Sequence, residues 1–74
     1  MTLPKMVPVE SSNISHIGYD NRAQELHVRF KDGATHAYAK VPAAVHISLM
    51  AAESIGAHFH AHVRHKFESR RVGK

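Results

Sequence analysis

The sequence predicts an α+β fold in which a three-stranded antiparallel β-meander is followed by two helices that pack on one face of the sheet. Apolar and polar residues alternate strictly along ELHVRF (residues 25–30), which is typical of a half-buried strand. The KDG segment that follows (31–33) has the composition of a hairpin turn, with Gly33 supplying a positive φ. After residue 42, apolar residues instead recur at three- and four-residue intervals, the spacing of amphipathic helices.

The three strands are expected in consecutive segments after an extended N-terminal arm. Pro4 and Pro8 exclude a helix from this arm, residues 1–8, and keep their neighbours extended. The first strand is expected within SSNISHIGYD (11–20), which ends in a turn at YDNRAQ. ELHVRF is the second strand, and ATHAYAKV (34–41) returns after the hairpin turn as the third.

The length of the hairpin turn decides which residues share a face of the sheet, and the sequence is compatible with two lengths. A two-residue turn places Arg29 opposite His36, so that these two residues and Tyr38 lie together on the exposed face. A cation, an imidazole and a phenol in that arrangement form a platform on which bases can stack. A three-residue loop shifts the register by one and turns His36 and Tyr38 toward the core. At the level of the sequence both alternatives stay open.

Two short helices are predicted in the C-terminal half. Pro42 is expected to open the first helix, because its missing N–H costs nothing at that position. Val45 and Leu49 belong to the apolar stripe of this helix. Ser54 is the expected N-cap of a second helix over residues 55–69. The apolar stripe of the second helix has four members at four-residue spacing: Ile55, Phe59, Val63 and Phe67.

The first helix also has a second apolar strip, made of Ala43, Ile47 and Met50, well away from its core stripe. An exposed apolar strip of this kind is typical of a surface that binds a partner. The alternative is that the N-terminal arm folds back and covers the strip. The candidate residues for contact with a protein partner are accordingly Leu3, Met6, Val7, Ile47 and Met50.

The net charge of +4 is concentrated at the C-terminus. Residues 1–63 hold five basic and five acidic side chains, whereas residues 64–74 hold five basic side chains and one acidic side chain. A basic end attracts polyanions, nucleic acid first among them, although cations also suit the negative end of a helix dipole. We expect a single domain over residues 9–70 and a basic tail over residues 71–74. The candidate phosphate contacts are Arg64, Lys66, Arg70 and Arg71.

Histidine is concentrated in GAHFHAHVRHK, residues 56–66. In a helix over residues 55–69, His58, His62 and His65 lie on one side. Three imidazoles on one side are a weak candidate for a zinc site with an open fourth position. No acidic residue lies on that side to orient the rings, so we predict no metal cofactor. The alternatives are a surface that gains charge below about pH 6.5 and an ordinary polar helix surface.

The composition excludes several classes of protein. A chain of 74 residues forms one domain with a small core and no room for a deep pocket, so we predict that it is not an enzyme. The absence of cysteine excludes disulfides and thiolate metal sites. No apolar run approaches the ~20 residues of a membrane span. We expect no cofactor, no small-molecule substrate, no membrane partner and a cytoplasmic location.

Several segments of the chain resemble the KTSC domain family. They are VESSNISHIGYD, LHVRFKDG, AYAKVP and LMAAESIGAHF, and they cover residues 9 to about 70. The family is named for its occurrence at the C-terminus of some lysyl-tRNA synthetases, and it includes stand-alone bacterial and phage proteins. The resemblance implies a small domain for which RNA binding has been suggested. The family's central YxY motif is altered here, because Tyr38 keeps its second position while His36 replaces the first tyrosine.

Together these observations lead us to expect a small non-enzymatic module that binds RNA, another nucleic acid or an RNA-handling machine. In this hypothesis the C-terminal cations contact phosphates, while Arg29, His36 and Tyr38 contact bases. The alternative is a phage-type or bacterial regulator that binds a host protein complex, such as RNA polymerase or a translation factor, and modulates transcription. The apolar arm and the strip around Ile47 motivate this alternative, and the basic end would speed association with an acidic patch.

Overall fold

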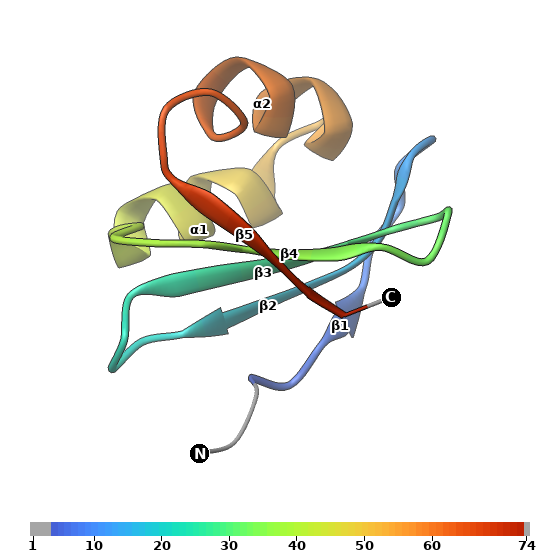
Figure 1. Ribbon diagram of the computed structural model, residues 1–74. Coiled ribbons are helices and arrows are strands. Elements are labelled where there is room, and N and C mark those ends of the chain that lie inside the picture. Colours follow the sequence, from blue (N-terminus) through green and yellow to red (C-terminus); the bar gives the residue numbers. More distant parts are fainter. Residues whose placement is uncertain (1–3, 74) are drawn as a thin grey trace.

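The computed structural model describes residues 4–73, which form a five-stranded antiparallel sheet with two helices on one of its faces (Figure 1). The strands lie in the sheet in their order along the chain, so each strand pairs with the next. Within this range the predicted α+β class and the two helices are confirmed. The predicted number of three strands is wrong, because two further strands form the edges of the sheet. The elements are β1 (Val7–Pro8), β2 (Ile14–Asp20), β3 (Glu25–Phe30), β4 (Thr35–Tyr38), α1 (Ala43–Ala51), α2 (Ile55–His62) and β5 (Ser69–Gly73).

The first additional strand, β1, forms the edge beside β2. Pro8 pairs with His16, and the N–H of Val9 donates to the carbonyl of Ser15 (3.0 Å). Proline is compatible with an edge strand, because the outer side of that strand has no partner for an N–H group. Residues 7 and 8 of the predicted arm therefore belong to the sheet.

The predicted second helix is too long. α2 ends at His62, and Val63 already departs from helical geometry (φ −122°, ψ −50°). A helix over residues 55–69 is therefore wrong. The four-residue apolar spacing continues past the helix because Val63 and Phe67 still pack against the core, the first fully buried and the second partly buried.

The end of the chain forms the second additional strand, β5. It pairs with β4, and the N–H of Ala39 donates to the carbonyl of Glu68 (2.8 Å) where the pairing begins. Without β5, the backbone groups of β4 would be unpaired at the edge of the sheet. Arg71, predicted to belong to a basic tail, pairs with His36 inside the sheet.

The turn between β3 and β4 is a three-residue loop. The N–H of Phe30 donates to the carbonyl of Ala34 (2.8 Å), which leaves residues 31–33 as the loop. Gly33 has a φ of 99°, so the predicted positive φ is confirmed.

This loop sets the register of the hairpin. Leu26 pairs with Tyr38, and Val28 pairs with His36. Paired residues of antiparallel strands share a face, so His36 and Tyr38 lie on the side that faces the core. Arg29 lies on the opposite face, because neighbouring residues of a strand alternate. The structure therefore has the register that turns His36 and Tyr38 toward the core. The prediction that Arg29, His36 and Tyr38 share one exposed platform is wrong.

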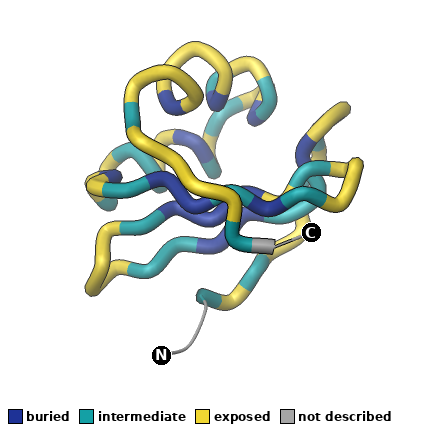
Figure 2. Tube along the Cα trace, in the orientation of Figure 1, coloured by how far each residue is buried: buried dark blue, intermediate teal, exposed yellow. Residues whose placement is uncertain are grey.

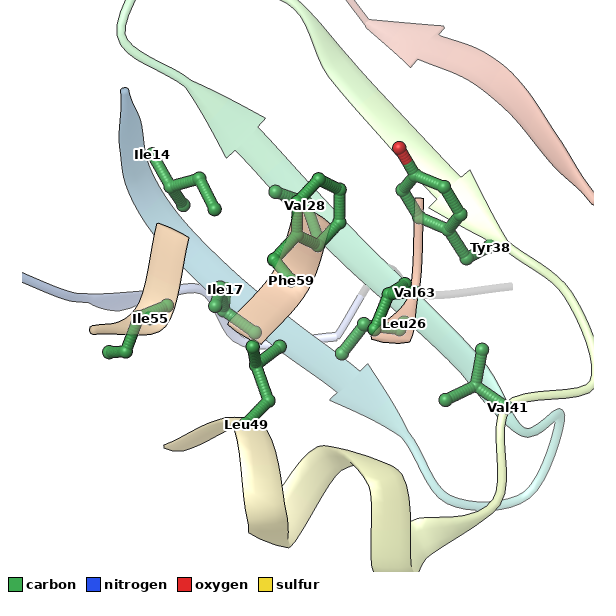
Figure 3. Close-up of a cluster of buried hydrophobic side chains, with 10 residues drawn as sticks. All are labelled: Ile14, Ile17, Leu26, Val28, Tyr38, Val41, Leu49, Ile55, Phe59 and Val63. Carbon is green, nitrogen blue, oxygen red and sulfur yellow. The ribbon is translucent and has the colours of Figure 1, made fainter. Parts of the chain in front are cut away.

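The hydrophobic core fills the space between the sheet and the helices (Figures 2 and 3). Leu49 of α1 and Phe59 of α2 point into it from the helix layer. Burying each such side chain contributes roughly 1.5–3 kcal/mol. The buried cluster consists of Ile14, Ile17, Leu26, Val28, Tyr38, Val41, Leu49, Ile55, Phe59 and Val63.

Both helices begin where the sequence predicts. Pro42 is the residue before the first turn of α1. Ser54 caps α2, and its hydroxyl accepts a hydrogen bond from the N–H of Ala57 (3.3 Å), which confirms its predicted role. The ring of Tyr19 on β2 stacks on His46 of α1 with centroids 4.7 Å apart, and burial lowers the pKa of His46. This contact fixes α1 against the sheet.

Candidate nucleic-acid interface

An open cleft of about 690 Å³ lies between the tip of the β3–β4 hairpin and the segment that links α2 to β5. The hairpin contributes Phe30, His36 and Tyr38 to its lining. Arg64 and His65 line it from the linking segment. Residues that are distant in the sequence are thus combined in one concave surface, on the side of the sheet that the helices cover.

The aromatic side of the cleft rests on α2. The ring of Phe30 contacts His36 edge-on (centroids 5.8 Å apart) and Phe59 edge-on (5.7 Å). The ring of Tyr38 also contacts Phe59 (5.4 Å). Phe30 and His36 remain partly exposed and are available to a ligand.

Tyr38 is largely a core residue, with only 4% of its surface exposed. Its hydroxyl points away from the aliphatic side chains of the core (Figure 3). Burial raises the pKa of the Tyr38 phenol, and the positive charge of Arg64 opposes this rise. Tyr38 is therefore uncharged at neutral pH and supports the cleft rather than offering a free ring face.

The rim of the cleft carries more positive than negative charge. Lys31 and Arg64 supply two cations, and Asp32 supplies one carboxylate. That carboxylate accepts a hydrogen bond from a backbone N–H of the hairpin (2.9 Å), which holds it at the loop. Arg71 pairs with His36 across β4 and β5, so its side chain starts on the same face as the cleft.

Two of the predicted nucleic-acid contacts lie on the other face of the sheet. Arg70 donates to both carboxylate oxygens of Glu25 (3.0 and 3.4 Å), and one of these oxygens is 3.2 Å from Nε2 of His27. The Arg70 hydrogen bond is the main cause of a lowered pKa of Glu25, with His27 contributing in the same direction. Arg29 donates through Nε to the hydroxyl of Thr35 (3.4 Å).

Of the residues predicted to contact nucleic acid, the cleft unites His36, Tyr38 and Arg64. Lys66 is exposed in the turn after α2 and is not part of the cleft lining. The hairpin turn could have indicated some of the other lining residues in the sequence, because residues that flank a turn lie at the same end of a sheet. The lining residues that the sequence did not predict as nucleic-acid contacts are Ser12, Asn13, Phe30, Lys31, Asp32, Ala34, His65 and Ser69.

The candidate contacts for a protein partner do not form one surface. Met6 lies on the sheet face opposite the helices, because its sulfur is close to the position where Gly18 would carry a Cβ atom. Among the described residues of the arm, Met6 therefore does not cover Ile47, which is 65% exposed on α1, while Met50 packs partly against the core. Val7 is 43% exposed on β1. Leu3 lies outside the described residues.

The histidines between residues 58 and 65 form two pairs instead of a group of three. The rings of His58 and His62 have centroids 4.4 Å apart, whereas His65 lies against His60 with centroids 6.0 Å apart. The predicted grouping of His65 with the first pair is wrong, because the helix ends before residue 65. Among residues 4–73, no group of three or more histidine, cysteine or acidic side chains is placed to hold a metal ion.

The serine-rich segment before β2 packs against the start of α2. The hydroxyl of Ser11 donates to the side-chain oxygen of Asn13 (3.1 Å) and accepts from the N–H of Ile14 (3.3 Å). A Cβ atom on Gly56 would lie 3.0 Å from both side-chain oxygens. Close packing therefore explains Ser11 and Gly56.

These features define a small α+β domain with a five-stranded antiparallel meander, two helices on one face and a cleft at the end of the central hairpin. The KTSC domain family model matches residues 10–67, and this chain belongs to that family. A protein of Tsukamurella paurometabola is 45% identical over 64 residues, which are 86% of this chain and 96% of the relative. The predicted resemblance is thereby confirmed.

Two further similarities extend the comparison. The crystal structure of a KTSC domain protein from Yersinia pestis matches with a TM-score of 0.92 and 35% identity, covering 96% of this chain and 100% of that one. A lysine–tRNA ligase of Nostoc punctiforme is 34% identical over 68 residues, which are 92% of this chain and 12% of the ligase. Neither helix within residues 4–73 is long and apolar enough to cross a membrane.

Proposed function

We propose that this protein is a non-enzymatic module that binds an unpaired segment of RNA in the cleft at the end of the β3–β4 hairpin. The observation that carries this proposal is the convergence of partly exposed rings with cationic side chains in one concave surface. Phe30 and His36 supply the rings, and Lys31 and Arg64 supply the cations.

Each part of the cleft matches one part of a nucleotide. Bases stack on aromatic side chains and imidazoles, and this stacking is worth roughly 1–3 kcal/mol per base. Phosphates are attracted by lysine and arginine, and their binding releases condensed counterions. Asp32 can accept a hydrogen bond from an exocyclic amino group, so it favours the base side of a nucleotide over its phosphate.

An unpaired strand suits the cleft better than a duplex. The rings lie inside a concave surface, whereas the bases of a duplex are stacked on each other and present only their edges. The deep major groove of double-stranded RNA is too narrow for side chains to read. A volume of about 690 Å³ is also within the usual range for one small ligand.

The comparison with a lysine–tRNA ligase supports RNA as the polyanion. That relative is named for an RNA substrate, and this chain resembles a part of it that is 12% of its length. We infer that the shared domain contributes contacts to RNA outside the catalytic reaction of the ligase.

The proposal is tested by fluorescence anisotropy with a short unstructured RNA and with the same RNA annealed to its complement. We expect the single strand to bind more tightly, and the affinity to fall when salt rises from about 50 to 200 mM. An RNA with abasic sites at matched charge is expected to bind more weakly, because the stacking contribution is lost. If none of these ligands binds, the proposal is wrong.

A second candidate function is contact with a protein partner through α1. The observation that favours it is Ile47, an aliphatic residue that is 65% exposed on a helix that packs against the core through Leu49. If this surface binds a partner, Ile47→Asp removes the partner from a pull-down while leaving the fold intact. Retention of the partner by Ile47→Asp would exclude this surface.

A further inference from the structure

His58 and His62 form a close pair on the outer side of α2. They are one helical turn apart in the sequence, and their rings are tilted by 38° with centroids 4.4 Å apart. His58 is partly exposed and His62 is exposed. Neither residue lines the cleft proposed to bind RNA, so this pair is independent of that proposal.

The fold holds the backbone beneath the pair in place. The hydroxyl of Ser54 caps the helix, and the N–H of His58 donates to the carbonyl of Ser54 (3.0 Å). Ile55 and Phe59 are buried on the inner side of the same helix. The helix therefore cannot rotate without exposing these two apolar side chains, and the two imidazoles stay on the same side.

Two histidines four residues apart on a helix can bind one metal ion together, as in helical zinc motifs. Imidazole nitrogens bind zinc at about 2.0–2.1 Å, so two of them on one ion lie roughly 3 Å apart. Rings with centroids 4.4 Å apart reach this arrangement through small rotations of their side chains. Neutral imidazole also suits copper and nickel.

We propose that His58 and His62 form a binding site for a divalent transition-metal ion of the zinc, nickel and copper group. Water occupies the remaining coordination positions, because no third ligand is placed nearby among residues 4–73. The site joins two turns of α2 through the ion. An ion that binds only the folded state stabilises that state, so the bound metal strengthens the C-terminal end of a short helix.

The second histidine pair of this region is a built-in control. His60 and His65 have centroids 6.0 Å apart and meet edge-on at 80°. Nδ1 of His60 is also 3.5 Å from the guanidinium of Arg64, whose positive charge opposes a metal ion there. This pair has the same residue types in the same region, but its rings lie farther apart and beside a fixed cation.

The test is thermal unfolding of the full chain, without an affinity tag, in the presence of zinc chloride alone and again after addition of EDTA. We expect zinc at a large excess over its dissociation constant to raise the melting temperature by at least about 5 °C. EDTA should reverse this rise. His58→Gln and His62→Gln should each abolish the rise, whereas His60→Gln and His65→Gln should keep it.

Calorimetric titration provides a second measurement that does not depend on stability. We expect one zinc ion per chain in the wild type and in His60→Gln, and a loss of affinity of at least about tenfold in His58→Gln. Circular dichroism of each variant without metal verifies that its helices are formed. The proposal is overturned if zinc leaves the wild type unchanged, or if His58→Gln and His60→Gln lose the same affinity.

Discussion

Leu26 lies directly opposite Tyr38 across the ladder between β3 and β4. This pairing places the Tyr38 ring in the core and turns His36, two residues earlier, toward the same side. A register one residue different would have put both rings on the face away from the helices. The cleft between the hairpin and the end of α2 therefore exists because the hairpin loop has three residues.

The Tyr38 ring should contribute more to stability than its hydroxyl. We expect Tyr38→Ala to lower the free energy of unfolding by about 3–5 kcal/mol, as for other large aromatic side chains removed from a core. Tyr38→Phe keeps the ring and its contact with Phe59, so we expect a loss below about 1.5 kcal/mol. Urea denaturation of both variants measures the difference. Equal losses would mean that the ring does not occupy the core.

Alkaline pH should destabilise the protein through the same residue. The pKa of Tyr38 is raised in the folded state, because burial disfavours the phenolate. Its contribution to stability is therefore fully present below about pH 10, the value of an unfolded tyrosine, and is lost as pH rises through the folded pKa. We expect the wild type to lose more stability than Tyr38→Phe when the pH is raised above about 10. Parallel pH profiles for the two proteins would contradict this explanation.

Low pH should remove the contribution of Glu25 to the free energy of unfolding. Its pKa is lowered in the folded state, first by the hydrogen bond from Arg70. The associated stability is present above the unfolded pKa and is lost as pH falls through the folded one. Because Arg70 is exposed, we expect Glu25→Gln to cost less than about 1 kcal/mol at neutral pH. The difference from the wild type should shrink as pH falls through the folded pKa of Glu25, as measured by denaturation across pH. A difference that stays constant across the acid range would have another origin.

The N-terminal arm should tolerate only glycine at position 18, because it passes close to that residue. A Cβ atom at this position would lie 2.7 Å from the sulfur of Met6 and 2.8 Å from the carbonyl oxygen of Lys5. We expect Gly18→Ala to cost about 1–3 kcal/mol, because the arm must shift. The same substitution in a chain that lacks residues 1–6 should cost clearly less. An equal cost in both chains would place the strain within β2 and β3 instead.

Local patterns in the sequence predicted much of the fold. The strict alternation in ELHVRF, the glycine of the hairpin loop and the capping serine at position 54 each depend on residues that are close in the sequence. The structure has a strand, a positive φ and a hydroxyl cap at these three places. The α+β class follows from these elements together.

The edge strands were not predictable in the same way. β5 exists because β4 has unpaired backbone groups at its outer side, which is a property of the assembled sheet. Phe67 continues the four-residue spacing of Phe59 and Val63, so the local pattern favours a longer helix than the one observed. β1 has only two residues, too few for any alternation.

The cleft was only partly predictable for a related reason. His36, Tyr38 and Arg64 were recognised by residue type, but their meeting depends on a register that two loop lengths allowed. Phe30 belongs to the apolar side of β3, and the sequence therefore indicated a core residue. Its partial exposure is a property of the assembled fold, which no local pattern indicates.

The most direct test of RNA binding in the cleft compares two arginine variants in a salt titration with single-stranded RNA. Arg64 lines the cleft, while Arg70 pairs with Glu25 on the other face of the sheet. We expect Arg64→Gln to weaken binding and to lower the slope of log affinity against log salt by about one unit. Arg70→Gln should leave both quantities near those of the wild type. Equal losses in the two variants, or an affinity that does not change with salt, would contradict binding in the cleft.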